Sequence, residues 1–536
     1  MSTQSPPAPP PAFEAPQLSH REILLVFSAL MLGMLLAALD QTVLATALPT
    51  IVGELGGLEH LSWVLTSYLL ASTASVPLYG KLGDLYGRKG MLQSAIILFV
   101  LGSITAGISQ DMTQMIASRA VQGIGAGGLM ATSQAIIGDI LSPRERGRYI
   151  GYLASVFAFS SVAGPLIGGF FTDGIGWRWV FYINVPLGLL AFVVATRVLK
   201  LPRRRVEHRI DFLGAGLLVG GVSAILLAMT WGGNEYAWGS TTITALLVGG
   251  AALIAVFVAQ ELRASEPILP LTLFKNRTFM VSSILGLLLG MALFGAIAFI
   301  PVYLQVVKGV SATESGLRTV PMMVGIVSMS IFSGRMISKT GQYRIYPIIG
   351  TAIAAVGLFL LSRLGVETSI WLLSAYLFLL GIGVGLVMQV TLLAVQNAVP
   401  FKDMGTATSG ATFFRSMGGA FGVALFGSVL SNRLDYHLPR FVDISALQGV
   451  GVRELTSSPE RLRALPPEVL DGVRNAFASS LETVFLLAVP LVVLAFIVSW
   501  FLPQVALRER APVGAAPGRE GTEAEAEAEP PEPVEV

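Results

Sequence analysis

The chain has 536 residues, of which 53% are hydrophobic and only 13% are charged, and its mean hydropathy is +0.71. These values exceed those of soluble globular proteins and indicate a membrane protein with many spans. The formal net charge of +2 gives no reason to expect nucleic acid as a partner. The absence of cysteine excludes disulfides and thiol catalysis, and no metal or other cofactor is expected.

The apolar residues are grouped into long runs. A membrane-spanning helix needs about 20 mostly apolar residues, and about fourteen segments of this kind are separated by short polar breaks. The predicted fold is therefore an all-α polytopic membrane protein. The expected spans are 23–48, 61–79, 91–109, 113–140, 149–171, 180–199, 212–230, 241–260, 280–306, 317–338, 345–362, 369–398, 406–431 and 478–502.

Basic residues are distributed unevenly between alternate loops. With a cytoplasmic N-terminus, about twenty Lys and Arg fall in short cytoplasmic loops, and only about three (Arg178, Lys308 and Arg363) fall in short loops on the other side. The positive-inside rule therefore predicts a multi-pass protein of the cell membrane with both termini in the cytoplasm. The first apolar run is too long for a cleavable signal and lacks a small-residue cleavage site.

The segments outside the spans are compositionally simple. Residues 1–21 are mostly Pro-rich, and residues 503–536 end in an acidic run, so both tails should be disordered and cytoplasmic. Residues 433–477 form the sizeable extracytoplasmic loop. The last part of this loop, 466–477, has the spacing of a short amphipathic helix on the membrane surface.

Three charged residues inside the spans need a reason, because each costs about 2.5 kcal/mol or more near the bilayer centre. Asp40 and Arg119 should share a depth in the outer half of the membrane, by the rise of 1.5 Å per helical residue. Asp40 is then a candidate proton carrier, or else a packing carboxylate that Arg119 satisfies without titration. Arg119 keeps its proton and can only position or bias a partner. Arg415 has no evident acidic partner, and either a water-filled cavity or backbone carbonyls would accommodate it.

Six strings stand out in chain order: LDQTVLATALP (39–49), GKLGDLYGRKG (80–90), RAVQGIGAGG (119–128), GPLIGG (164–169), WRWVFYINVP (177–186) and EPILPLTLFKNRTF (266–279). Together they resemble the major facilitator superfamily, and in particular its fourteen-helix drug:proton antiporters. The second string resembles the superfamily loop after helix two, the third resembles the helix-four signature, and the fourth resembles the antiporter signature of helix five.

The resemblance implies an architecture and a function. Two six-helix bundles, 22–200 and 266–502, would flank an inserted helix pair at 201–265. The expected function is proton-coupled export of lipophilic or amphiphilic compounds, as in multidrug efflux and antibiotic resistance, with small lipophilic substrates, protons and the bilayer as partners and a monomeric state. No enzyme activity is expected. Apart from Glu482 near the start of the last span, the spans of the second half lack Asp and Glu, which favours neutral or monocationic substrates, or lipids.

Glycines and charges at the helix ends are candidates for gating. Gly80, Gly83 and Gly87 would let helices approach and the chain turn. In similar transporters the aspartate, here Asp84, faces the helix that opens near Gly405–Thr406, and the arginine, here Arg88, pairs with an acid, here Asp139. The remaining gating candidates form a kinked, smooth helix face: Gly164, Pro165, Gly168 and Gly169.

The substrate cavity should contain amide and aromatic side chains, which are unusual against lipid. These candidates are Gln122, Gln134, Tyr303, Gln305, Gln389, Gln396, Phe413, Phe414 and Arg415. Two other functions stay open: a lipid or glycolipid exporter on the same scaffold, and a sensor or assembly scaffold with a transporter fold.

Overall fold

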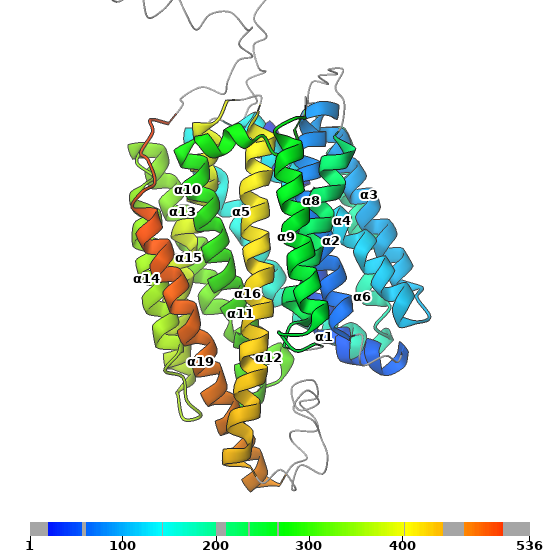
Figure 1. Cartoon of the computed structure of the whole chain (residues 1–536), viewed down its shortest axis with the longest axis vertical. Helices are drawn as coiled ribbons and strands as arrows, with labels where there is room; N and C mark the ends of the chain where they lie inside the picture. The colour runs from blue at the N-terminus through cyan, green and yellow to red at the C-terminus, as the bar shows by residue number, and fades with distance from the viewer. Residues whose placement is uncertain are drawn as a thin grey trace, which may run out of the picture.

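The computed structural model describes residues 20–55, 61–141, 143–199, 211–233, 236–264, 267–400, 403–442 and 466–507. Within these ranges the named elements are all helices (Figure 1), which confirms the predicted fold class. Helix α2 (Leu61–Tyr86) ends at one end of the bundle, the Arg88 end, where α3 (Arg88–Gly107), α5 (Pro143–Phe170) and α16 (Met404–Phe441) begin. Helix α16 ends and α19 (Pro467–Ser499) begins at the opposite end, the Phe441 end.

The first half of the chain forms one bundle. Asp111 caps the fourth helix by accepting from the Gln114 amide, so a short polar turn fixes where that helix begins. Two apolar clusters, around Phe27 and Phe99 and around Trp177 and Phe181, fill the interior. The elements are α1 (His20–Leu55), α2 (Leu61–Tyr86), α3 (Arg88–Gly107), α4 (Met112–Ile140), α5 (Pro143–Phe170), η2 (Phe171–Ile175), α6 (Trp179–Tyr182) and α7 (Asn184–Val198).

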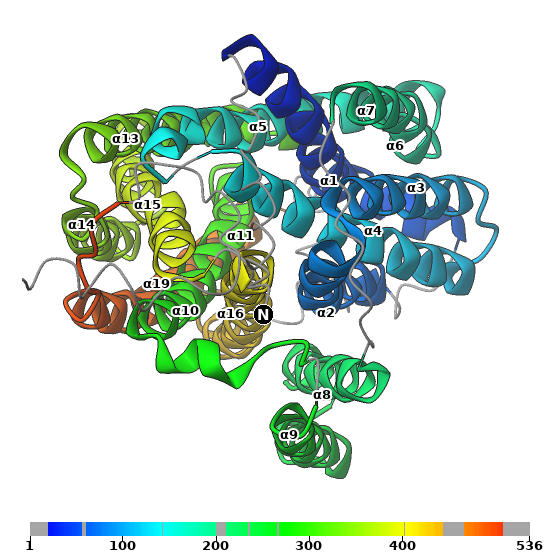
Figure 2. The ribbon, with the colours of Figure 1, turned by 90° about the horizontal axis from the view of Figure 1, so that it is seen from above.

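The inserted pair consists of α8 (Phe212–Trp231) and α9 (Thr241–Glu261). Seen along the helices, the pair stands beside the two bundles (Figure 2). The described part of its turn folds back through a contact between Gly232 and Tyr236. The pair therefore adds to the perimeter without entering the space between the halves.

The second half forms the other bundle, and a large apolar cluster within it includes Phe426, Phe477 and Phe485. Its first span is broken by two π-helical turns. The elements are η3 (Leu271–Lys275), α10 (Arg277–Leu289), η4 (Gly290–Phe294), α11 (Gly295–Val302), η5 (Tyr303–Val307), α12 (Ala312–Arg318), α13 (Val320–Thr340), α14 (Ile345–Leu361), α15 (Ile370–Ala398), α16 (Met404–Phe441) and α19 (Pro467–Ser499).

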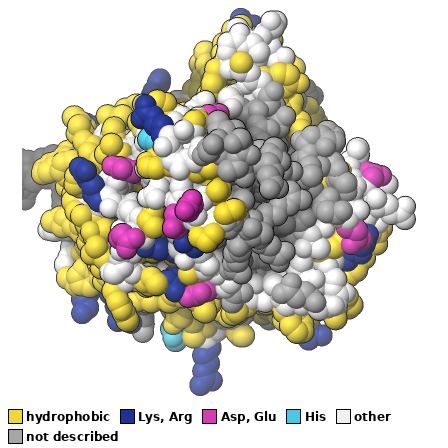
Figure 3. Space-filling model, turned by 90° about the horizontal axis from the view of Figure 1, so that it is seen from below, with side chains coloured by type: hydrophobic (Ala, Val, Ile, Leu, Met, Phe, Trp, Pro, Cys, Tyr) yellow, Lys and Arg dark blue, Asp and Glu magenta, His cyan; other side chains and the backbone are white. Residues whose placement is uncertain are grey.

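The outer surface suits a bilayer. Ten helices or helix series in the described ranges are long and apolar enough to cross a membrane, and each of the fourteen expected spans falls on a helix or helix series. Large apolar side chains such as Phe170 and Phe212 face outward, with 68% and 76% of their surface exposed. Figure 3 views the Phe441 end, where charged side chains of both signs gather inside a hydrophobic edge. Lipid can cover the apolar sides of the helices, because the backbone groups there are hydrogen-bonded within the helices.

Glycines allow neighbouring helices to pack closely in both halves. A Cβ on Gly164 would lie 2.1 Å from the Thr42 Oγ1, and one on Gly168 would lie 2.0 Å from the Thr46 Oγ1. In the second half, a Cβ on Gly422 would lie 1.9 Å from the Met291 carbonyl oxygen. The small face expected on the fifth helix thus packs against α1.

The predicted loop 433–477 is helical at both of its ends. Helix α16 continues to Phe441, and residues 467–477 are the first turns of α19 and not a separate surface helix. Val473 and Phe477 are buried, because α19 packs against α16. The apolar positions of 466–477 face another helix instead of lipid. Residues 443–465 of the expected loop and both expected tails, apart from 20–21 and 503–507, lie outside the described residues.

Candidate functional site

Asp40 lies at the centre of a buried polar cluster in the first bundle. Its Oδ2 accepts from the Arg119 Nη1 at 2.6 Å, and its Oδ1 accepts from the Gln122 Nε2 at 2.7 Å and the Asn184 Nδ2 at 3.0 Å. The whole Asp40 and Arg119 residues are each only 1% exposed. Two helices, α4 and α7, thus supply donors to one carboxylate of α1 far from bulk water.

The Arg119 guanidinium is satisfied on several sides. Besides Asp40, it donates to the Gln122 Oε1 at 2.5 Å and to the Val64 carbonyl at 3.5 Å. Its Cζ lies 4.2 Å from the centroid of the Tyr68 ring, which adds a cation–π contact. Arg119 is therefore fixed in place and sets the environment of the carboxylate.

Two members of this cluster were not among the sequence-based candidates. Ser103 accepts from both Gln122 and Asn184 at 2.9 Å and donates to the Phe181 carbonyl at 3.2 Å. Asn184 has a sequence signal, because it lies within the string WRWVFYINVP. Ser103 has none, since a serine in an apolar run is common and its role depends on which helix it faces.

A second polar cluster closes the Arg88 end. The Arg88 Nε donates to the Asp139 Oδ2 at 2.9 Å, and the same guanidinium forms an ion pair with Asp84. Asp84 also accepts from the Thr406 amide at 3.0 Å and the Thr406 hydroxyl at 2.9 Å. A Cβ on Gly80 would lie 1.9 Å from the Ser409 Oγ. The structure places Asp84, Arg88 and Asp139 as the resemblance implies, and this cluster links the two halves.

Arg146 provides another link between the halves that sequence reasoning missed. It counted only as a loop charge, yet it is 2% exposed and its Nη1 donates to the Gln396 Oε1 at 2.6 Å. The Gln396 Nε2 in turn donates to the Gln134 carbonyl at 3.3 Å, and the Thr412 hydroxyl donates to the Gln134 Oε1 at 2.9 Å. Gln134 and Gln396, expected in the cavity, thus lie in contacts between the bundles.

The remaining cavity candidates are dispersed. Gln122 belongs to the Asp40 cluster. The Tyr303 hydroxyl donates to the Gly365 carbonyl at 2.9 Å, and its ring is packed in the second-half core. The rings of Phe413 and Phe414 stack edge to face with centroids 5.4 Å apart. Gln305 and Gln389 are half-buried and take no part in these clusters.

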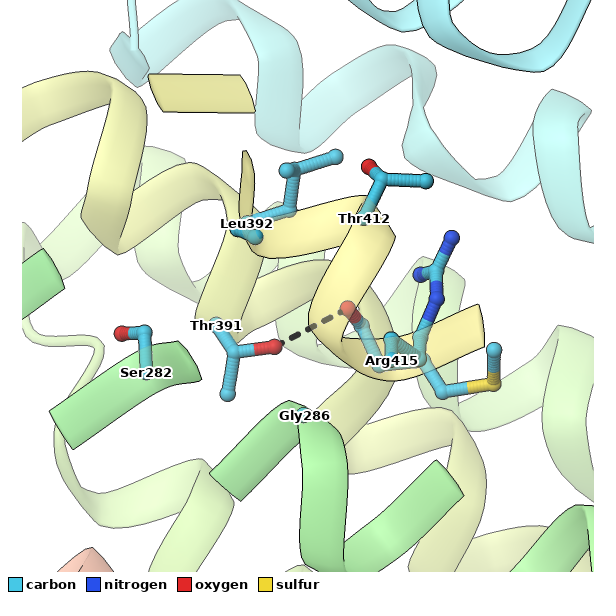
Figure 4. Close-up of a pocket in the computed structure, with 8 residues that line it drawn as sticks. Ser282, Gly286, Thr391, Leu392, Thr412 and Arg415 are labelled. Atoms are coloured by element: carbon cyan, nitrogen blue, oxygen red, sulfur yellow. Dashed lines mark hydrogen bonds between the residues drawn. The ribbon is translucent and has the colours of Figure 1, made fainter. Parts of the chain in front are cut away.

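Arg415 lines a small cavity in the second bundle (Figure 4). The cavity lies between α10, α15 and α16, and the Arg415 side chain extends away from its helix. Among the described residues, no hydrogen bond or ion pair to its guanidinium is formed. The lining residues are Ser282, Gly286, Met388, Thr391, Leu392, Ala411, Thr412 and Arg415.

An exposed pair marks the Phe441 end. Glu54 accepts from the Arg178 Nη1 at 2.5 Å and the Trp177 Nε1 at 2.8 Å. The hydrogen bond from Arg178 lowers the pKa of the Glu54 carboxyl below its usual value, and the bond from Trp177 acts in the same direction. This pair ties the end of α1 to the segment before α6.

Two helical bundles joined by polar contacts at one end, with a charged pair buried in one of them, define a membrane transporter rather than an enzyme. The chain belongs to the Major Facilitator Superfamily, whose family model matches residues 30–423. It is 43% identical over 507 residues to an uncharacterized MFS-type transporter of Mycobacterium tuberculosis strain H37Rv, covering 94% of this chain and 73% of that protein.

Other matches agree with this assignment. The chain is 35% identical over 511 residues to the multidrug transporter protein MdtP of Bacillus subtilis, covering 91% of this chain and 94% of MdtP. The solved proton:xylose symporter XylE superposes with a TM-score of 0.60 at 14% identity, covering 90% of this chain and 96% of XylE. The likeness to XylE concerns the fold alone. The resemblance to superfamily multidrug transporters seen in the sequence is confirmed.

Proposed function

We propose that the protein is a proton-coupled exporter of lipophilic or amphiphilic compounds that works by alternating access, with the Arg88 end in the cytoplasm of the cell. The observation that supports it most is the buried cluster around Asp40. Such a carboxylate is costly at this depth and marks an ion pathway in membrane proteins. The similarity to MdtP supports drugs as cargo.

In this proposal Asp40 exchanges a proton for substrate. The charged carboxylate accepts three hydrogen bonds from Arg119, Gln122 and Asn184, so the cluster stabilises its ionised form. Protonation from the outside removes the charge that holds Arg119, and the cluster must rearrange. That rearrangement would bias the two bundles toward the conformation that opens to the cytoplasm.

The contacts at the Arg88 end form the gate that this change acts on. Arg88, Asp84 and Thr406 join the halves directly, and Arg146 joins them through Gln396. These bonds stabilise the conformation that is closed at the Arg88 end and must break before cargo enters from the cytoplasm.

The proton gradient supplies enough free energy. One elementary charge crossing about 150 mV releases roughly 3.5 kcal/mol, at about 2.3 kcal/mol per 100 mV. This amount supports a concentration ratio of several hundredfold, since each 1.4 kcal/mol corresponds to a factor of ten.

The test uses purified protein in liposomes that enclose a pH-sensitive dye. A pH gradient is imposed and lipophilic compounds are added to wild type, Asp40→Asn and the matched control Glu54→Gln. We expect substrate-dependent proton movement in wild type and the control, and none in Asp40→Asn. Equal proton movement in Asp40→Asn would contradict the role of Asp40, and silence of all three proteins with a broad panel would contradict drug antiport.

The lipid-export alternative has lost one of its supports. It depended on a surface helix at 466–477 that would engage lipid, and those residues begin the packed helix α19. The sensor or scaffold alternative predicts that Asp40→Asn leaves function intact, so the same experiment separates it from transport.

A further inference from the structure

Arg415 carries a charge deep within the second bundle. It lies on α16, which begins at Met404, so at 1.5 Å per residue it stands about 16 Å from the start of that helix. This depth is close to the middle of a hydrocarbon core about 30 Å thick. An arginine at this depth keeps its proton and costs about 2.5 kcal/mol or more.

Arg415 is half-buried, and the buried arginines Arg88, Arg119 and Arg146 all have partners. Arg88 pairs with Asp84 and Asp139, Arg119 pairs with Asp40, and Arg146 donates to Gln396 and to backbone carbonyls. Arg415 has no such acceptor among the described residues, backbone carbonyls included. Of the two surroundings that the sequence left open for Arg415, the structure therefore provides the cavity.

The cavity is lined by both polar and apolar side chains. Thr391, Thr412 and Ser282 bring hydroxyl groups, and the Ser282 Oγ is buried without a hydrogen-bond partner in the described part of the chain. Met388 and Leu392 bring apolar surface. The lining contains no acidic residue, so the positive charge lacks a counter-charge from the protein.

We infer that Arg415 is the head-group subsite for an amphiphilic compound with one anionic group, such as a carboxylate, sulfonate or phosphate. The guanidinium supplies a planar set of donors suited to these anions. Ser282 offers an additional hydroxyl in the same cavity, and the apolar part of the ligand lies toward Met388 and Leu392. The inference rests on the proposed export function and names the substrate class for it.

This substrate class differs from the one the sequence favoured. The near absence of Asp and Glu from the second-half spans, where Glu482 is the exception, favoured neutral or monocationic compounds, or lipids. An unpaired arginine in the same half disfavours a cation there, because like charges repel strongly where the dielectric constant is low. In the present conformation the cavity has room for about one water molecule, so the ligand binds when the bundles are further apart.

The test compares ligands that share one tail. Hexanesulfonate, hexyltrimethylammonium and hexanol are titrated onto the full-length protein in phosphatidylcholine nanodiscs, with empty nanodiscs as the blank, and binding is followed by calorimetry. The proteins are wild type, Arg415→Gln, Arg415→Lys and the control Arg363→Gln, an exposed arginine outside the cavity. We expect wild type and the control to bind the sulfonate at least tenfold more tightly than Arg415→Gln does, and hexyltrimethylammonium to bind Arg415→Gln no more weakly than wild type.

Several results would overturn the inference. Equal sulfonate affinity in wild type and Arg415→Gln is one, and a wild-type preference for hexyltrimethylammonium over the sulfonate is another. If Arg415→Gln does not fold, Arg415→Lys decides, because it keeps the charge and must keep the preference for the sulfonate. A folded Lys variant without that preference contradicts the subsite.

Two further arms identify the source of the anion and separate the two proposals. If phosphatidylglycerol in the nanodisc competes with hexanesulfonate, the subsite binds a lipid head group. If phosphatidylglycerol leaves the binding of hexanesulfonate unchanged, the subsite binds a soluble amphiphile. Transport of the same three compounds is then measured in liposomes. Export of the cation alone would overturn only the anion subsite, whereas binding of the sulfonate with export of none would overturn the proposed function.

Discussion

Arg119 and Arg415 are both arginines on membrane helices, one in each bundle, but Arg119 is buried and Arg415 is half-buried, and their surroundings differ completely. Arg119 donates to Asp40, Gln122 and a backbone carbonyl and lies over the Tyr68 ring. Arg415 faces a cavity and has no acceptor in the described residues. The first arginine can bias only the carboxylate beside it, whereas the second is available to a ligand. The two proposals therefore assign the proton to the first bundle and the cargo to the second.

Removing the partner of Arg119 should have the largest effect on the stability of the folded protein. Asp40→Ala leaves a buried arginine without its carboxylate, which we expect to destabilise the folded protein by about 3–5 kcal/mol. The measurement is the thermal unfolding midpoint in nanodiscs. The double variant Asp40→Ala with Arg119→Met is the control and should recover a substantial part of the loss. If the double variant is no more stable than the single one, the ion pair is not the cause.

Replacing Arg415 should have the opposite effect on the stability of the folded protein. Arg415→Leu removes a charge that has no protein partner, so it should raise the stability of the ligand-free protein by up to about 2.5 kcal/mol. The same unfolding midpoint measures this change, and Arg363→Leu at the surface serves as the control. A clear loss of stability in Arg415→Leu would mean that the two arginines are alike and that Arg415 is held by the protein.

Weakening the gate should change conformation more than stability. Gln396→Leu removes the acceptor of Arg146 across the two halves, and we expect it to shift the balance about tenfold toward opening at the Arg88 end, the effect of about 1.4 kcal/mol. The natural chain has no cysteine, so spin labels on Tyr86→Cys and Lys339→Cys report the distance between the halves directly. Gln389→Leu, on the same helix but outside the link, should leave the distance distribution unchanged.

Acidification should have the smallest effect, at the Phe441 end. The hydrogen bonds from Arg178 and Trp177 lower the pKa of Glu54 in the folded state, so their stabilisation is present above the unfolded value of 4.5 and is lost as the pH falls through the folded value. Glu54 is half exposed, and solvent keeps the effect small. The difference in unfolding midpoint between wild type and Glu54→Gln should be present at pH 6 and vanish near pH 3. A difference that persists at pH 3 would assign it to packing.

Some residues of the candidate site could be predicted from the sequence, and others could not. Asp40, Arg119 and Arg415 were visible because a charge in a long apolar run is rare. Asp84, Arg88 and Asp139 were visible through the resemblance of residues 80–90. Arg146 was not, because an arginine in a basic loop is the usual topological signal, and only the approach of α15 gives it an acceptor in the other half of the chain. The cavity candidates were the weakest predictions, since an amide that lines a cavity and one that joins two helices occur in the same sequence context.

The sequence by itself determined the all-helical fold class, the long apolar helices and the rare charges inside them, because the hydrocarbon core accepts only long apolar helices and makes each exception costly. Only the tertiary structure decided which polar groups meet. Ser103 and Asn184 are far apart in sequence and both reach the Asp40 cluster, α19 absorbs the expected surface helix, and Arg415 has a cavity where Arg119 has a carboxylate. Contacts between helices depend on which faces their glycines and side chains bring together, and no single helix carries that information.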